Sequence, residues 1–185
     1  MSGLWCVNIG YGRSELADVA SQQMKELPFY NTFFGTTHPP VINLSKKIAS
    51  IAPKNLNHVF FSSSGSEAND TNIRLARHFW ATYGEPTKKI IISRVNAYHG
   101  SSMGSASLGG MESMHSQGGM PIPDICHIKQ PYWYAEGGEM SPDEFGISRA
   151  RDLENKILQL GSENVAAFIA EPIQGAGGVI IPPKT

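Results

Sequence analysis

A turn rich in serine and glycine at residues 64–66 places hydrogen-bond donors where a helix is expected to begin. The first backbone N–H groups of a helix have no acceptor within it, and the helix dipole adds about half a positive charge there. Gly65 allows a ligand close to the backbone, and the hydroxyls of Ser64 and Ser66 add further donors. The turn therefore predicts a phosphate site; the alternative is that its serines only cap the helix. Neither a Walker loop nor GxGxxG occurs, so a different phosphorylated cofactor stays open.

Three further side chains follow apolar runs that are typical of buried parallel strands. Tyr98 and His99 come shortly after the run at 89–93, and Glu171 directly follows the run at 165–170. Open α/β sheets bind ligands at the carboxyl ends of their strands, so we expect all three at one edge, with Tyr98 able to stack on a planar ring. The alternatives are that Tyr98 packs in the core, that His99 is a hydrogen-bonded surface residue and that Glu171 is a solvated strand end.

Residues 100–104, Gly-Ser-Ser-Met-Gly, suggest a second chemistry because they fit the GxSxG pattern of α/β-hydrolases. Ser102 would then be the nucleophile, with His115 or His127 as its base. The pattern requires a strand that runs directly into the serine turn. Here the strand is expected to end several residues earlier, near Ser93, so a serine hydrolase is the remote alternative.

The elements that would position these residues alternate between helices and apolar runs. Apolar spacings of three and four predict helices at about 14–27, with Ser14 as N-cap, and at 41–51, 65–84 and 141–160. Runs prone to β structure predict strands at 3–9, 58–62, 89–93 and 165–170. This alternation indicates an α/β layered fold, with function on the Gly- and Ser-rich loops of residues 94–140.

The composition is that of a globular chain without strong charge. The 185 residues are 41% hydrophobic and carry 15 Lys plus Arg against 16 Asp plus Glu, a net charge of −1. We therefore expect one sizeable core, and neither nucleic acid nor a membrane as a partner. Cys6 and Cys126 form neither a disulfide framework nor a zinc motif, so we expect no metal and a cytoplasmic location. Apolar segments at both ends predict a piece of a longer protein.

Six motifs follow one another along almost the whole chain. They are GLWCVNIGYG at 3–12, PFYNTFF at 28–34, SSGSE at 63–67, NAYHG at 96–100, SLGGM at 107–111 and EPIQGAGG at 171–178. Together they resemble class III aminotransferases, most closely the ω-transaminases of the amine–pyruvate type. The resemblance implies the aspartate-aminotransferase fold, which is fold type I for pyridoxal 5′-phosphate, with an incomplete large-domain sheet, mixed or parallel, and flanking helices.

The resemblance also divides the chain and assigns residues to the cofactor. Residues 1–52 would be an N-terminal segment of strand and helices that forms a pocket wall and dimer contacts, and residues 53–185 a partial cofactor-binding large domain. Residues 64–66 match the phosphate loop, Tyr98 the aromatic residue that stacks on the pyridine ring, and Glu171 the acid that orders a neighbouring aspartate. The full matching set is Ser64, Gly65, Ser66, Tyr98, His99, Gly100 and Glu171.

Three aromatic residues match the lining of the ω-transaminase substrate pocket, namely Trp5, Phe33 and Phe34. An apolar pocket of that kind would favour amines that carry alkyl or aryl groups. From the residues alone each could be a core residue, and for Phe34 the core is the favoured interpretation. The resemblance further implies a small-molecule amine and a keto acid as reactants, and a homodimer or a complementing chain.

Two functional residues of the family have no match here. The family uses a lysine that forms a Schiff base with the cofactor and an aspartate that keeps the pyridine nitrogen protonated. Both lie downstream of the segment that matches 171–183, and none of the lysines fits the family's loop: Lys25, Lys46, Lys47, Lys54, Lys88, Lys89, Lys129, Lys156 and Lys184. We therefore expect a transaminase parent whose 185 residues alone bind the cofactor weakly and are inactive. The alternatives are a non-catalytic pseudoenzyme that dimerises or binds, and a truncated gene product.

Overall fold

The computed structural model describes residues 3–32 and 34–184 of the chain. The chain divides into two compact units, Met1–Phe60 and Phe61–Thr185. The division falls after Phe60, whereas the boundary expected from the sequence lies after residue 52. The domain roles assigned to the two parts stay predictions.

The first unit contains two helices, α1 at Ser14–Glu26 and α2 at Pro39–Ile51. Both were expected from the apolar spacing. Helix α2 begins at the Pro39-Pro40 pair because proline is tolerated in the first turn, where no helical N–H bond is lost. Helix α1 differs in one detail, since its N-cap is Arg13 and Ser14 is already helical.

The strand expected at residues 3–9 is wrong. Turns occupy this segment, in which the N–H of Cys6 donates to the carbonyl of Gly3 at 3.1 Å and the N–H of Gly10 to that of Val7 at 3.1 Å. Leu4 and Trp5 have positive φ angles of 54° and 72°, outside the β region. An apolar run becomes a strand only where a neighbouring strand pairs with it, and the described part of this unit contains none.

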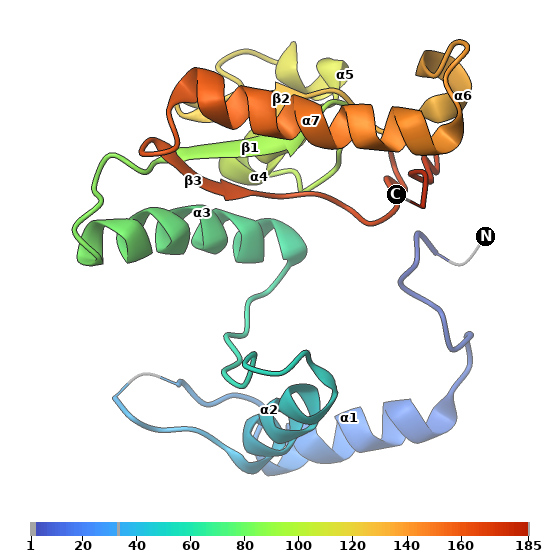
Figure 1. Ribbon diagram of the computed structural model, residues 1–185. Helices are drawn as coiled ribbons and strands as arrows, with labels where there is room; N and C mark the ends of the chain where they lie inside the picture. Colours follow the sequence, from blue (N-terminus) through green and yellow to red (C-terminus); the bar gives the residue numbers. More distant parts are fainter. Residues whose placement is uncertain (1–2, 33, 185) are drawn as a thin grey trace. The chain divides into compact units, whose positions relative to one another are not determined.

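The second unit is built on a parallel sheet of three strands in the order β2-β1-β3 (Figure 1). They are β1 at Ile90–Arg94, β2 at Ile125–Ile128 and β3 at Val165–Phe168. In register, Ile92 of β1 pairs with Cys126 of β2 and Phe168 of β3. The central strand β1 has a continuous buried run, as its unbroken apolar sequence predicts.

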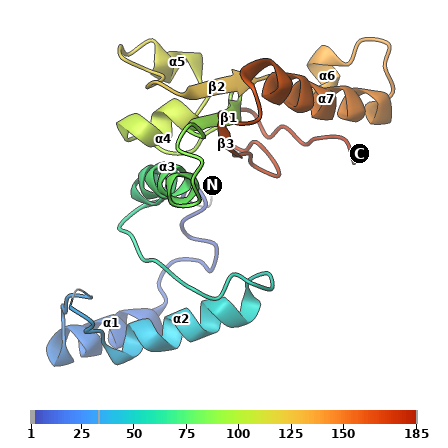
Figure 2. The same cartoon turned by 60° about the vertical axis from the view of Figure 1, so that its left-hand side comes forward.

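Helices cover both sides of this sheet (Figure 2). Helix α7, Pro142–Leu160, lies on one side, while α3, Gly65–Thr82, and α4, Met103–Leu108, lie on the other. Helix α7 starts with the expected capping box, in which the Ser141 hydroxyl and the Glu144 carboxylate each accept a backbone N–H bond. Residues of four elements form the core cluster: Ile73, Ile91, Leu108 and Ile125.

Two further predictions differ from the structure. Residues 58–62 form no strand, although α3 begins three residues after this β-prone run, at Gly65, as expected. Residues 94–140, expected as loops, contain β2 and the short helices α4, α5 at Glu112–His115 and α6 at Trp133–Glu136. The three helices have four to six residues each, too few for the apolar spacing of a helix to repeat, and the strand β2 has only four residues.

Across residues 3–32 and 34–184, no helix is both long and apolar enough to pass through a bilayer.

Candidate functional site

The N-terminus of α3 combines a helix cap with free donors. The hydroxyl of Ser64 accepts the N–H of Glu67 at 3.1 Å, and the carboxylate of Glu67 accepts the N–H of Ser63 at 2.7 Å. These bonds leave the amides of Gly65 and Ser66 without a partner among the residues that the structure describes. Capping and anion binding are therefore compatible, because different atoms perform them.

The loop after β1 and the start of α4 are fixed to α3 by three long-range hydrogen bonds. Asn69 donates its side-chain amide to the carbonyl of His99 at 2.7 Å, and the N–H of Ser101 donates to the hydroxyl of Ser66 at 3.0 Å. The N–H of Ser105 donates to the carboxylate of Asp70 at 2.7 Å. The acceptors and donors on α3 are three and four residues apart, so they share one face of the helix.

Gly100 is required where this loop approaches α3. Its φ of 137° is a conformation that other residues rarely adopt. A Cβ at this position would lie 2.7 Å from the Cβ of Ser105 and 2.7 Å from the hydroxyl oxygen of Ser66. Only a residue without a side chain therefore fits between the loop and the helix.

Glu171 joins the two loops that leave the carboxyl ends of β1 and β3. Its carboxylate accepts the N–H of Tyr98 at 2.9 Å and the N–H of Gly175 at 3.1 Å. The placement of Tyr98, His99 and Glu171 at one edge of the sheet, expected from their positions after parallel strands, agrees with these bonds. The side chain of Glu171 thus orders backbone and is not a solvated strand end.

A cavity of about 290 Å³ opens where these parts come together. It is bounded by α3 on one wall and by the loop after β1 on the other, and Tyr98 is 44% exposed there. Its lining residues are Gly65, Ser66, Asn69, Tyr98, His99 and Gly100. Free amides at a helix N-terminus beside an aromatic ring suit a ligand that has both a phosphate and a flat ring. No lysine is in this lining.

Asn69 is the lining residue that sequence reasoning missed. It follows Ser66 by three residues on α3, so the helical spacing of a residue behind the phosphate loop could have identified it.

The three predicted pocket residues belong to the first unit of the chain, Met1–Phe60. Trp5 is 71% and Phe34 is 98% exposed, while Phe33 lies outside the described residues. The interpretation of Phe34 as a core residue is therefore wrong. Its φ of 59°, beside Gly35 at 73°, places it in a turn that presents the ring to the surface. The pocket roles of Trp5, Phe33 and Phe34 stay predictions.

The structure does not assemble the serine-hydrolase site. The hydroxyl of Ser102 bonds the hydroxyl of Ser105 at 2.7 Å, at the start of α4. The Nε2 atoms of His115 and His127 lie 3.2 Å and 3.3 Å from the carbonyls of Ala106 and Leu108. Both imidazoles thus face backbone, and the strand before the motif ends at Arg94, as the sequence argument against this alternative required.

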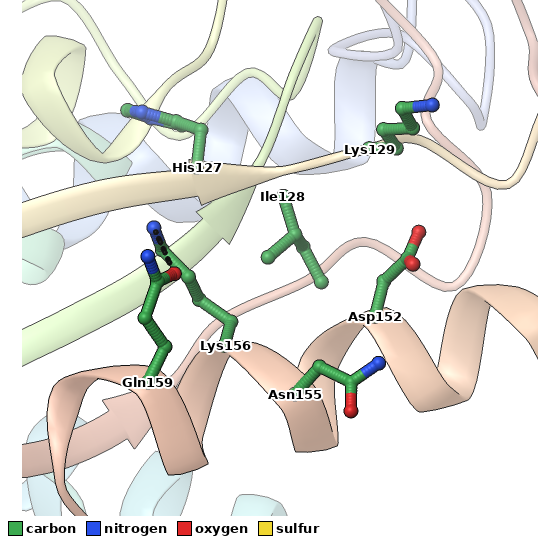
Figure 3. A pocket seen from close by; sticks show the side chains of 7 residues that line it. All are labelled: His127, Ile128, Lys129, Asp152, Asn155, Lys156 and Gln159. Carbon is green, nitrogen blue, oxygen red and sulfur yellow. Dashed lines mark hydrogen bonds between the residues drawn. The ribbon is translucent and has the colours of Figure 1, made fainter.

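A second cavity, of about 440 Å³, lies between β2 and α7 (Figure 3). Lys156 donates to the side-chain oxygen of Gln159 at 3.3 Å within it, and Asp152 pairs with Arg149 at 3.1 Å. None of the residues expected to hold a cofactor lines this cavity.

His99, one of the residues that line the first cavity, is buried. Its imidazole lies 3.2 Å from the hydroxyl of Ser93 on β1. Burial lowers the pKa of His99 below its ordinary value of 6.5; the Glu171 carboxylate opposes this shift and His127 adds to it. Burial likewise lowers the pKa of His127. Both side chains are therefore mainly neutral at pH 7.

The lowered pKa of His99 makes the stability of the chain depend on pH. The unfolded chain takes up a proton as pH falls through about 6.5, whereas the folded chain does so only at lower pH, so acidification favours unfolding in that interval. We expect the free energy of unfolding to fall between about pH 7 and pH 5.5, and to fall less steeply in His99→Gln. Urea unfolding at both pH values measures this, with exposed His78→Gln as the control. An equal slope for His99→Gln and the parent would contradict the assignment.

Comparison with known proteins identifies the family of the chain. The family model for class III aminotransferases matches residues 1–185. A putrescine–pyruvate aminotransferase of Pseudomonas aeruginosa is 66% identical over 185 residues, which is 100% of this chain and 41% of the relative. A diaminobutyrate–2-oxoglutarate transaminase of Halomonas elongata is 42% identical over 186 residues, or 99% of this chain and 40% of the relative.

A solved structure gives the same result for the fold. A thermostable (S)-enantioselective ω-transaminase from Thermomicrobium roseum superposes with a TM-score of 0.95 at 44% identity, covering 98% of this chain and 41% of that one. The expected transaminase fold is thereby confirmed for the part present, and the chain spans about two fifths of the length of the curated relatives it matches. With the family model matched over its whole length, the chain belongs to the class III aminotransferases, a family that depends on pyridoxal phosphate.

Proposed function

We propose that these 185 residues supply the phosphate-binding and ring-binding part of an aminotransferase site for pyridoxal 5′-phosphate. The observation that carries the proposal is the 290 Å³ cavity, because its lining joins free amides of Gly65 and Ser66 to the ring of Tyr98. These groups are more than thirty residues apart in the sequence yet border one space. The residues present therefore fit a phosphorylated aromatic cofactor.

The residues of the cavity would divide the work between the phosphate and the ring. The amides of Gly65 and Ser66, at the N-terminus of an 18-residue helix, would hold the phosphate dianion. The Ser66 hydroxyl, which accepts from Ser101, keeps its own proton to donate. Tyr98 would lie against the ring, its backbone held by Glu171. The bound cofactor would act as an electron sink for the substrate carbanion.

Amino-group transfer would require two side chains that this sequence does not supply. The resemblance places a lysine and an aspartate downstream of the segment that matches 171–183, and the cavity lining contains neither. We propose that the 185 residues are not competent alone and act together with that lysine and aspartate. Contacts with a second copy or a complementing chain, and a cytoplasmic location, belong to the same proposal.

The amine and the acceptor are proposed from the relatives. The relative of 66% identity is named for putrescine and pyruvate, and the one of 42% identity for diaminobutyrate and 2-oxoglutarate. Both names describe a donor with two amino groups and a keto acid. We therefore propose a diamine donor and pyruvate as acceptor, with Trp5, Phe33 and Phe34 beside the apolar part of the donor.

Calorimetric titration with pyridoxamine 5′-phosphate tests the proposal. This probe has the phosphate and the ring but no aldehyde, so it forms no adducts with the nine lysines. We expect the 185-residue chain to bind it about tenfold or more tightly than unphosphorylated pyridoxamine, since the charged hydrogen bonds are lost with the phosphate. We also expect no alanine from putrescine and pyruvate with added pyridoxal 5′-phosphate. Equal affinities would contradict the phosphate site, and alanine formation would contradict the requirement for further residues.

A further inference from the structure

The segment after β3 contacts the loop that carries Tyr98 through other groups besides the Glu171 carboxylate. Residues 171–175 run beside residues 94–98, and the guanidinium of Arg94 donates to the carbonyl of Glu171 at 3.4 Å. The backbone of Gln174 is fixed by two hydrogen bonds with Ile180, at 3.1 Å and 3.0 Å. These two bonds close a short turn and fix the backbone position from which the Gln174 side chain extends.

The side chain of Gln174 is buried but only half bonded. Gln174 is 1% exposed, and its Nε2 donates to the carbonyl of Val95 at 3.0 Å. Its Oε1 is buried without a hydrogen-bond partner in the part of the chain described. A buried acceptor without a donor destabilises a fold, and an apolar side chain of similar length would avoid that cost. A contribution to stability is thus a poor explanation for a glutamine here.

Val95 is the first residue of the turn that leads to Tyr98. Asn96 in that turn has a φ of 59°, and the carbonyl of Asn96 lies against Gly177, where a Cβ would collide with it. Gln174 supports the turn at Val95, and Glu171 supports it again three residues later at the N–H of Tyr98. Two hydrogen bonds three residues apart fix both the position and the direction of the backbone that carries the Tyr98 ring.

We propose that Gln174 is a positioning residue, whose amide bond to Val95 fixes the Tyr98 ring at the wall of the cavity. Gln174 itself does not line the cavity, so it acts through Val95 and the turn. The value of this position for catalysis rests on the proposed function, whereas the ordering of Tyr98 by Gln174 does not.

Amide hydrogen exchange of the 185-residue chain tests the ordering without any ligand. In Gln174→Met, which keeps the length and removes the amide, we expect the Tyr98 N–H to exchange about tenfold faster, while the N–H of Ile92 in β1 exchanges as in the parent. The midpoint of thermal unfolding should change little, because the loss of the donor to the Val95 carbonyl and the removal of the unpaired oxygen have opposite effects on stability. Exposed Gln159→Met is the matched control and should change neither amide.

A second variant, Gln174→Glu, separates positioning from general packing. The carboxyl group that this substitution introduces can donate to the Val95 carbonyl only when it is protonated. The Tyr98 N–H should therefore exchange as slowly as in the Gln159→Met control at low pH, and faster than in that control as pH rises. The proposal is overturned if the Tyr98 N–H exchanges in Gln174→Met as it does in the parent. It is also overturned if the N–H groups of Tyr98 and Ile92 exchange faster by the same factor and Gln174→Glu shows no dependence on pH. Failure of the chain to bind pyridoxamine 5′-phosphate would instead overturn the proposed function and leave the exchange result intact.

Discussion

Gly65→Pro is expected to weaken the binding of pyridoxamine 5′-phosphate by about ten- to a hundredfold. The substitution removes one amide donor from the phosphate site, and a hydrogen bond to a charged group contributes about 1.5–3 kcal/mol. Proline suits this position, since Gly65 is the first residue of α3 and proline is favoured there. Ser64 before it has φ −159° and ψ 163°, the extended conformation that a residue preceding proline adopts. The helix should therefore stay intact.

Gly65→Ala is the matched control for this variant. Open space surrounds the position of its Cβ, with no atom of the described chain within 4 Å, and alanine keeps the N–H. We expect Gly65→Ala to bind far more tightly than Gly65→Pro, and both to unfold at the same denaturant concentration as the parent or slightly higher. Calorimetry and urea unfolding measure the two effects. If proline and alanine weaken binding equally, the amide of residue 65 does not hold the phosphate.

Gly100→Ala is expected to cost about 3–5 kcal/mol of unfolding free energy, the range of substitutions that combine backbone strain with a steric clash. The φ of 137° is strained for any residue with a β-carbon, and the added atom would lie 2.7 Å from Ser105 and from Ser66. Relief would require the loop to move away from α3, which opens the cavity between them. Loss of stability and loss of phosphate binding should therefore appear together.

Gly118→Ala provides the comparison for that loss. Gly118 also has a positive φ, 82°, but no atom lies within 4 Å of the position of its Cβ. We expect a cost of about 1 kcal/mol there, from backbone strain alone. Urea unfolding of both variants separates the conformational part from the clash, and similar costs at residues 100 and 118 would show that the contact with α3 is not tight.

The sequence predicted those helices and strands whose formation depends on residues within the element itself. Helix α7 was predictable because the capping box at Ser141 and the apolar spacing up to Gly161 lie within the element itself. Strands β1 and β3 were predictable because unbroken apolar runs fit a sheet covered on both faces. The failures at residues 3–9 and 58–62 share a cause, since a strand is stable only beside another strand and a run of side chains does not specify that neighbour.

The candidate site divides in the same way. The sequence by itself determined the free donors at residues 65 and 66, because a helix start and its dipole follow from a few neighbouring residues. It also determined that Tyr98 and Glu171 share an edge, because parallel strands end on the same side. Only the tertiary structure decided that Asn69 holds the carbonyl of His99 and that Gln174 holds that of Val95. Such bonds join residues 30 and 79 positions apart, and which backbone groups meet at that separation depends on the packing of the whole sheet and its helices.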